Sequence, residues 1–164
     1  SIKKALAHLE KTLSSNNRKL TVITQNVDEL HRVAGSENLI ELHGTLYKTR
    51  CTRCEKISPN RENPIVEALS NITEVEKNRK IELDALPKCQ DCSGLLRPHI
   101  VWFNESLSDD DMSRAHDAMD ECDLVLVIGT SSVVYPAAMF APAASSRCDL
   151  GQGYLRFVYL IGKI

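Results

Sequence analysis

The chain begins with apolar residues at helical spacing and continues with a short, uninterrupted apolar run. From Ile2 to Leu13 apolar side chains recur every three or four positions, which predicts an amphipathic helix over residues 2–14. Polar residues end this helix, and the β-branched run Leu20–Thr24 predicts a buried strand. The pattern therefore starts as a helix followed by a strand.

Polar side chains come directly after this strand. Gln25, Asn26 and Asp28 offer amide and carboxylate groups that turn chemistry alone does not explain. Open α/β sheets bind their ligands at the carboxyl ends of the strands. The residues themselves leave two interpretations open, a ligand site and a plain strand-to-helix turn. Beyond them, Asp28 to Ala34 predicts a short helix, which Gly35 ends.

Another helix, followed by another strand, is predicted further along the chain. Ser108 is placed to cap a helix whose first turn is acidic, as the helix dipole favours. The predicted inward face of this helix consists of Met112, Ala115, Ala118, Met119 and Cys122. The apolar run from Asp123 to Ile128 then predicts a parallel strand buried on both faces. Strands that alternate with helices in this way predict a doubly wound parallel sheet.

This second strand is also followed by polar residues, Gly129-Thr130-Ser131-Ser132. Strands of a parallel sheet end at the same edge, so this motif and Gln25-Asn26 can share one crevice. Gly129 would let a ligand approach the backbone, and the hydroxyls and amides after it can bind ribose or phosphate oxygens. An ordinary turn is the alternative interpretation of the same residues.

His43 is the candidate general base. It follows the short apolar stretch 38–42 and precedes Gly44. The unperturbed pKa of histidine, about 6.5, suits proton transfer near neutrality. A histidine beside glycine is more often a surface or packed side chain, so that interpretation stays open. His31 is assigned to packing, and His8 and His116 are assigned to the surface.

The middle of the chain has a different composition. Residues 46–52 predict a strand that leads into a pair of cysteines. Residues 55–88 are rich in Asn, Glu, Lys and Ser, and predict a solvated insertion with one helical turn around Val66–Leu69. Regular structure is expected to return at residues 95–103.

Four of the six cysteines form two pairs, Cys51-x-x-Cys54 and Cys89-x-x-Cys92. Four thiolates suit a tetrahedral Zn²⁺, and full protein ligation leaves no open position for catalysis. The polar insertion accounts for the 34 residues between the pairs, and Gly94 would relieve crowding beside the second pair. We therefore predict one structural zinc ion and a reducing compartment, with four free or buried cysteines as the alternative.

Composition and charge exclude some function classes. Apolar residues make up 43% of the 164 residues and charged residues 26%, as in an ordinary globular protein. The formal net charge of −2 gives no general reason to bind nucleic acid or an anionic membrane. No apolar run approaches the roughly 20 residues that span a bilayer.

Three motifs together resemble the core of the sirtuins, which are NAD-dependent protein-lysine deacylases. They are the octet Thr24–His31, the dipeptide His43-Gly44 and the run Gly129–Ser132, in the expected order. The resemblance extends from about Leu20 to Arg147, and the family has a similar small zinc module. It implies that His43 is the catalytic base. It also implies NAD contacts by Gln25, Asn26, Val27 and Asp28 on the nicotinamide side, and by Gly129, Thr130 and Ser131 on the adenosine side.

The segment Val101-Trp102-Phe103-Asn104-Glu105 resembles the sirtuin segment that pairs with the substrate peptide as an added strand. This implies that Val101, Trp102 and Phe103 bind acylated lysine peptides, while a core role for the aromatic pair is the alternative. The family usually has glycine where Asn104 stands, and Asn tolerates left-handed backbone better than most residues. The run 97–103 is most similar to class III sirtuins, which favour succinyl, malonyl and glutaryl lysine.

Both ends of the chain depart from the family. Sirtuins begin with a Gly-Ala-Gly-x-Ser loop that cradles the NAD diphosphate, whereas no glycine precedes Gly35 here. After Arg147 the tail 148–164 does not match the family, although residues 154–161 predict a strand that fills a vacated position in the sheet. There is no signal peptide and no initiator methionine, so we expect a fragment.

The predicted fold class is α/β. We expect a partial Rossmann-like parallel sheet from residues 1–50 and 95–147, an inserted zinc-ribbon module at 51–94, and a divergent tail at 148–164. By resemblance the protein is mitochondrial, cytosolic or both. The sequence makes no prediction about its oligomeric state.

Three functional hypotheses follow. The first is NAD-dependent removal of succinyl, malonyl, glutaryl or acetyl groups from protein lysines, giving nicotinamide and O-acyl-ADP-ribose. The second is a catalytically weak or inactive sirtuin fragment that acts by binding. Because nothing in this chain replaces the phosphate loop, we expect the family assignment to hold and the isolated chain to be weak or inactive. The third, a zinc-ribbon module that binds nucleic acid, is disfavoured because the charge is near neutral and no basic patch contains interleaved aromatic residues.

Overall fold

The computed structural model describes residues 1–70, 80–130, 134–145 and 157–161. These residues form two compact units. The first contains residues 1–44 and 101–164, and the second contains residues 45–100. Within the described residues, no helix has the length and apolar character that crossing a membrane requires.

A parallel four-stranded sheet forms the centre of the first unit. Its strand order is β2-β1-β7-β6, and each neighbouring pair runs parallel. The strands are β1 (Leu20–Thr24), β2 (Leu39–Glu41), β6 (Leu124–Ile128) and β7 (Phe157–Ile161). The expected α/β class and Rossmann-like parallel sheet are therefore confirmed.

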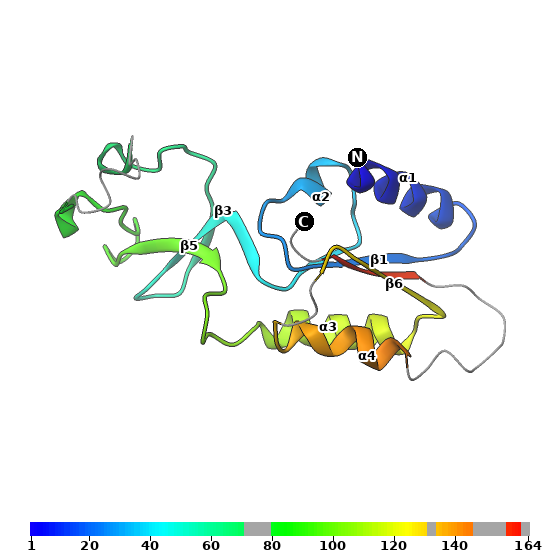
Figure 1. The fold of residues 1–164 in the computed structure, drawn as a ribbon. Helices are drawn as coiled ribbons and strands as arrows, with labels where there is room; N and C mark the ends of the chain where they lie inside the picture. Colours follow the sequence, from blue (N-terminus) through cyan, green and yellow to red (C-terminus); the bar gives the residue numbers. More distant parts are fainter. Residues whose placement is uncertain (71–79, 131–133, 146–156, 162–164) are drawn as a thin grey trace. The chain divides into compact units, whose positions relative to one another are not determined.

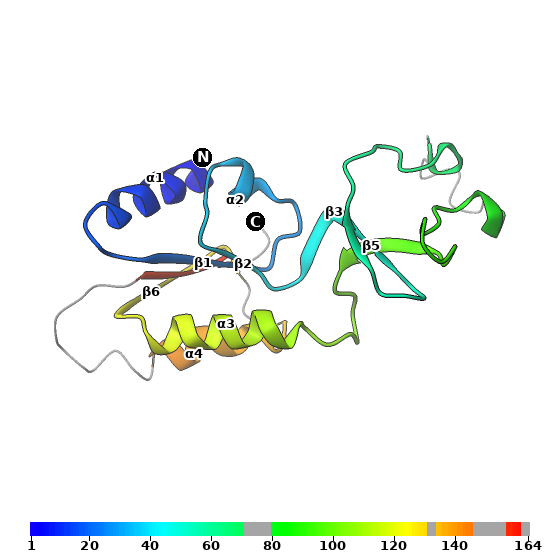
Figure 2. The same ribbon diagram turned by 180° about the vertical axis from the view of Figure 1, so that it is seen from behind.

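Helices cover both faces of this sheet. Figure 1 shows α1 (Ile2–Ser14) and α2 (Leu30–Val33) on one side, with α3 (Asp109–Asp120) and α4 (Phe140–Ser145) on the other. The view from behind in Figure 2 shows the same two layers. The sheet is therefore doubly wound, as expected.

Each face of the sheet has its own apolar core, because neighbouring residues of a strand point to opposite faces. In β1, Val22 packs toward α1 and Ile23 packs toward α3. The core beneath α1 consists of Leu6, Leu13, Leu20, Val22 and Leu39. The opposite core consists of Ile23, Ile40, Leu42, Ala115, Met119, Ala137 and Phe140. All five residues predicted for the inward face of this helix lie in or against the second core, although α3 ends at Asp120 and Cys122 follows it.

The chain's last described strand occupies the middle of the sheet. β7 pairs with β1 on one side and with β6 on the other, so that Ile161 is in register with both Thr24 and Ile128. The predicted strand at 154–161 is therefore confirmed over 157–161, and residues 154–156 lie outside the described part of the chain. The common register places the carboxyl ends of all three strands at one edge.

Several sequence predictions need correction in the first unit. The helix expected over 28–34 begins only at Leu30, because Glu29 has left-handed backbone (φ 52°) and Asp28 Oδ1 accepts from the Leu30 amide at 3.0 Å. The strand β6 is half-buried rather than buried on both faces, with Val127 44% exposed. The reason is that β6 is an edge strand among the described strands of this sheet.

The second unit is built on a small sheet with the order β4-β3-β5. These strands are β3 (Gly44–Cys51), β4 (Ile57–Pro59) and β5 (Leu96–Ile100), and β3 pairs antiparallel with β4. Two 3₁₀ turns, Glu67–Leu69 and Leu83–Ala85, lie in the described part of the chain between β4 and β5. The predicted helical turn at 66–69 is therefore a 3₁₀ turn, and the sequence missed β4, a three-residue strand that ends in proline.

The first unit contains one buried histidine whose charge state matters for stability. His31 is 1% exposed, and among the described residues neither ring nitrogen has a hydrogen-bond partner. Burial lowers the pKa of His31 below its ordinary value, and the Lys3 ammonium lowers it further, against the opposing effect of the Asp28 carboxylate. The expected packing role is confirmed, and the neutral imidazole is the favoured form.

We predict that acid destabilises the protein through this side chain. The unfolded chain binds a proton on His31 at a higher pH than the folded chain, so the free energy of unfolding falls as the pH drops below about 6.5. One such group contributes a slope of at most about 1.4 kcal/mol per pH unit. Urea denaturation at a series of pH values measures this slope, and His31→Leu should reduce it.

The exposed His8 on α1 provides the matched control, because His8→Gln removes a histidine without emptying the core. An equal pH dependence in wild type and His31→Leu would contradict the prediction.

Candidate functional site

Two polar segments meet at the carboxyl edge of the parallel sheet. Gln25 follows β1 and Thr130 follows β6, and these two strands are separated in the sheet by β7. The Gln25 side-chain amide Nε2 donates to Thr130 Oγ1 at 3.3 Å. Residues 105 positions apart in the sequence are thus brought into direct contact, which is the juxtaposition expected of strand ends that share one edge.

The residues after Gln25 form a short, hydrogen-bonded segment. Asn26, Val27 and Asp28 are all half-buried. The Asn26 backbone amide donates to Thr24 Oγ1 at 3.1 Å, which tightens the turn out of the strand. The Asp28 carboxylate reaches α1, where the Lys3 ammonium donates to Oδ2 at 3.2 Å.

The segment after β6 offers exposed backbone. Gly129 has a φ of +63°, a conformation that costs residues with a side chain about 1 kcal/mol or more. It is also exposed, so a ligand can approach its peptide groups without meeting a side chain. Thr130 is half-buried, and Ser131 lies outside the described residues.

His43 lies in the turn between β2 and β3, close to this edge of the sheet. It follows Leu42, which is 1% exposed and anchors the end of the β2 segment in the core. His43 Nδ1 lies 3.1 Å from the backbone oxygen of Gln25. A carbonyl can only accept, so Nδ1 carries a proton, and in the neutral ring the lone pair lies on Nε2. A base at Nε2 is therefore available beside the strand ends.

The backbone of His43 also holds the aromatic segment. The Val101 amide donates to the His43 carbonyl at 3.0 Å. Trp102 and Glu105 then close a turn, in which the Glu105 amide donates to the Trp102 carbonyl at 3.1 Å and Glu105 Oε2 accepts from the Trp102 amide at 2.9 Å. Asn104 has the left-handed backbone that its type tolerates, with φ +69°.

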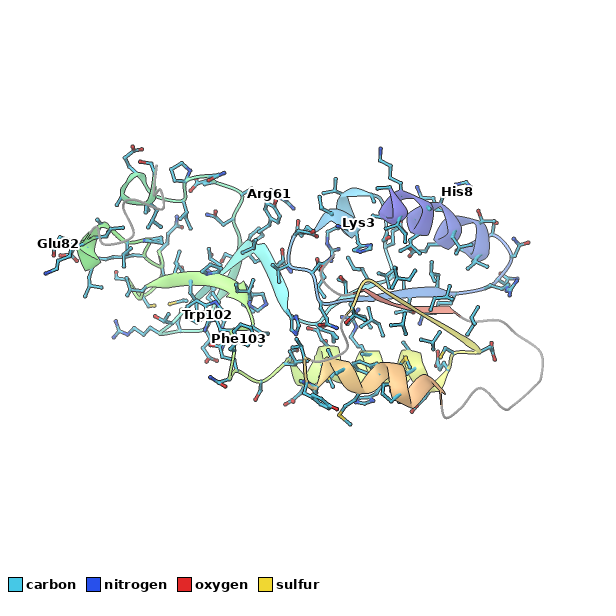
Figure 3. The ribbon with its side chains drawn as sticks, viewed as in Figure 1. Lys3, His8, Arg61, Glu82, Trp102 and Phe103 are labelled. Carbon is cyan, nitrogen blue, oxygen red and sulfur yellow. The ribbon has the colours of Figure 1, made fainter. Side chains whose placement is uncertain are left out.

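This turn exposes the two aromatic side chains (Figure 3). Trp102 is 51% exposed and Phe103 is 90% exposed, and both lie beyond the end of β5 at Ile100. The core interpretation of the aromatic pair is therefore wrong. An exposed phenylalanine held on a hydrogen-bonded turn is available to a partner.

The four paired cysteines come together in the second unit. The Sγ atoms of Cys51, Cys54, Cys89 and Cys92 all lie within 4.8 Å of one another. Four soft sulfur ligands in one cluster suit a tetrahedral ion such as Zn²⁺. The cysteines are positioned to bind one structural metal ion, with every coordination position taken by protein.

The two pairs adopt the same backbone turn. The amide of each first cysteine donates five residues ahead, from Cys51 to the Lys56 carbonyl at 3.0 Å and from Cys89 to the Gly94 carbonyl at 2.7 Å. The residue after each second cysteine has left-handed backbone, with φ +59° at Glu55 and +58° at Ser93. Repetition of one turn on two segments is what a site closed by two cysteine knuckles requires.

Glycine is needed beside the second knuckle. A Cβ at position 94 would lie 2.6 Å from the Arg53 Cβ and 2.9 Å from Cys51 Sγ. The expected role of Gly94 in relieving crowding is confirmed.

The Cys54 and Arg53 amides donate to Cys51 Sγ and lower the pKa of this thiol to about 6, which favours the metal-binding thiolate.

Sequence reasoning missed one residue of this site. Lys3 contacts Asp28 from α1, 25 positions away. Its place in the helical pattern marks it only as one of two neighbouring lysines, so no local signal distinguishes Lys3 from Lys4. The contact depends on how α1 packs over the sheet.

Comparison with a family model gives a match to the Sir2 family over residues 2–136. An NAD-dependent protein deacylase from Daphnia pulex is 51% identical over 148 residues, covering 87% of this chain and 54% of the relative. The mitochondrial NAD-dependent protein deacylase sirtuin-5A of Xenopus laevis is 49% identical, covering 87% of this chain and 48% of the relative. The chain thus spans about half the length of the curated relatives it matches.

Solved structures of Sir2 proteins also superpose on this chain. A complex of a Sir2 homologue with NAD superposes with a TM-score of 0.67 at 33% identity, covering 96% of this chain and 52% of the other. A Sir2–p53 peptide–NAD⁺ complex gives a TM-score of 0.65 at 32% identity, covering 95% of this chain and 63% of the other.

We predict that the cysteine cluster binds one zinc ion per chain and that loss of this ion unfolds the second unit. Cys89→Ser should lose the metal and lower the Tm by more than about 10 °C, because binding of a structural zinc ion contributes its free energy directly to folding. Elemental analysis and thermal unfolding measure the two effects, and chelation of the wild-type ion should reproduce the second. Cys122→Ser, outside the cluster, should retain the metal. A metal-free wild type with an unchanged Tm after chelation would contradict the prediction.

Proposed function

The chain belongs to the Sir2 family, and from this premise we propose that it supplies the catalytic histidine and part of the NAD site of a protein-lysine deacylase. The observation that carries the proposal is the convergence of three groups at one edge of the sheet. Gln25 bonds to Thr130 at 3.3 Å, and its carbonyl faces His43 Nδ1 at 3.1 Å. A base, an amide and a hydroxyl beside exposed glycine backbone suit a ribose-containing ligand.

We assign the two halves of NAD to the two strand ends. Gln25, Asn26, Val27 and Asp28 would hold the nicotinamide ribose and the nicotinamide. Gly129, Thr130 and Ser131 would bind along the adenosine half. The half-buried side chains after β1 and the exposed backbone of Gly129 fit such a ligand. When bound, NAD would supply a ribose carbon that forms a bond to the oxygen of the acyl group while its bond to nicotinamide breaks.

His43 would move the proton in this reaction. Its Nε2 lone pair can take a proton from a ribose hydroxyl, which makes the hydroxyl oxygen a better nucleophile. The proton on Nδ1 stays there and is donated in a hydrogen bond to the Gln25 carbonyl oxygen, at 3.1 Å, and that bond becomes charge-assisted once Nε2 is also protonated. The carbonyl thereby fixes the tautomer and stabilises the charged ring.

The acylated substrate would dock on the aromatic turn. The segment Val101–Phe103 is anchored to the His43 carbonyl through the Val101 amide, at 3.0 Å. A peptide aligned along Val101, Trp102 and Phe103 would therefore lie next to the catalytic residue. The resemblance of residues 97–103 to class III sirtuins is the basis for proposing acidic acyl groups (succinyl, malonyl and glutaryl) as substrates, with acetyl as a further one.

Two further assignments complete the proposal. Several relatives carry the word mitochondrial in their names, so we propose a mitochondrial protein, with the cytosol as an additional location. The metal ion has a structural role, because four thiolates leave no position for substrate.

A second candidate function is binding without turnover. The observation that favours it is the exposure of Trp102 and Phe103, 51% and 90%, on a preformed turn. Such a turn can capture an acylated peptide whether or not the reaction follows.

Peptide turnover followed by mass spectrometry distinguishes the two functions. Zinc-loaded chain is incubated with matched acetyl-lysine and succinyl-lysine peptides, with and without NAD. We predict loss of the acyl group only with NAD, and a decrease of at least about 100-fold in His43→Ala, as expected when a general base is removed. His8→Ala, on the exposed face of α1, is the matched control and should retain activity. Absence of turnover from folded, zinc-containing wild type would contradict the deacylase proposal and favour binding alone.

A further inference from the structure

We propose that Lys3 is a positioning residue for NAD, because its ion pair fixes the carboxylate of Asp28. The proposal rests on the assignment of Asp28 to the nicotinamide side of the cofactor. It adds a residue from α1 to a site that is otherwise built from the strand ends. The contact that carries it is the 3.2 Å ion pair between Lys3 Nζ and Asp28 Oδ2.

Both oxygens of Asp28 are held by the protein. Oδ1 accepts from the Leu30 amide at 3.0 Å, and Oδ2 accepts from Lys3 Nζ at 3.2 Å. The first contact comes from the turn that starts α2, and the second comes from α1. With two separate anchors the carboxylate cannot rotate freely, so its plane is set before a ligand arrives.

Lys3 is suited to this role by its surroundings. Its side chain is only 17% exposed, whereas the neighbouring Lys4 is an exposed residue. The helix that carries it is fixed to the sheet by Leu6 and Leu13 in the core. The ammonium is therefore held on a rigid element, and it loses less side-chain entropy in the pair than a fully solvated lysine would.

His31 does not compete for the same carboxylate. It lies in the same region, but neither of its ring nitrogens has a hydrogen-bond partner among the described residues. Burial and the Lys3 ammonium lower its pKa against the opposing effect of Asp28, which favours the neutral ring. Among the described residues, Lys3 is the cation paired with Asp28.

The remaining capacity of Asp28 matches a carboxamide. An ionised carboxylate has about four acceptor positions, and the Leu30 amide and Lys3 use two of them. The amide group of nicotinamide carries two N–H donors and needs an acceptor. A carboxylate that is already oriented binds such a donor at a smaller entropic cost than one that must be ordered by the ligand.

The test is calorimetric titration of the zinc-loaded chain with NAD, which does not depend on turnover. Lys3→Met should weaken NAD binding about three- to tenfold, a range kept modest because Asp28 is 39% exposed and the pair is partly screened. Lys3→Arg keeps the cation and should bind nearly as wild type does. Lys4→Met is the matched control, since it makes the same change one residue along the helix.

A double-mutant cycle separates positioning from general damage. If Lys3 acts through Asp28, Lys3→Met should have no further effect on the NAD dissociation constant in an Asp28→Asn background. Thermal unfolding of each variant checks that the fold is retained. Wild-type affinity in Lys3→Met, or additive losses in the double mutant, would overturn the proposal while the proposed function stands. Failure of the wild-type chain to bind NAD would instead contradict the proposed function, and the role of Lys3 with it.

Discussion

The parallel register of three strands is the constraint on which the candidate site depends. Thr24, Ile161 and Ile128 are aligned across β1, β7 and β6, so three chain segments leave the sheet at the same edge. Side chains that follow different strands can then touch, as Gln25 and Thr130 do. A slip of one residue in β1 would also exchange Val22 and Ile23 between the two apolar cores, so the cores that stabilise the sheet also hold the site in register.

The second unit reaches stability by a different route. Among the described residues of this unit, three strands form one small sheet, and Cys51 and Cys89 are the buried apolar side chains. A unit of this size has little core, and the four cysteines are positioned to bind one structural metal ion that would take the place of a larger core. The proposed catalytic groups and the cysteines that can hold a metal ion therefore belong to different units, with His43 and the strand ends in the first and the cysteines in the second.

Local signals in the sequence predicted much of this arrangement. The spacing of Ala115 and Met119, the β-branched run before Gln25 and the two CxxC pairs each have a short-range physical cause, and the structure contains all three features. Long-range packing could not be predicted in the same way. The exposure of Trp102 and Phe103 follows from a turn closed by Glu105, and the Lys3–Asp28 pair follows from the docking of α1 on the sheet. Neither the turn nor the ion pair produces a periodic pattern in the sequence.

The central claim, that NAD binds at the carboxyl edge of the parallel sheet, is tested most directly by nuclear magnetic resonance. Side-chain amide signals of Gln25 and Asn26 and the backbone signals of Gly129 and Thr130 would be followed as NAD is added to the labelled, zinc-loaded chain. The account predicts that these signals shift together with one dissociation constant, while those of the cysteine knuckles stay in place. Saturating NAD that leaves the strand-end signals unchanged, or that shifts only signals elsewhere, would contradict it.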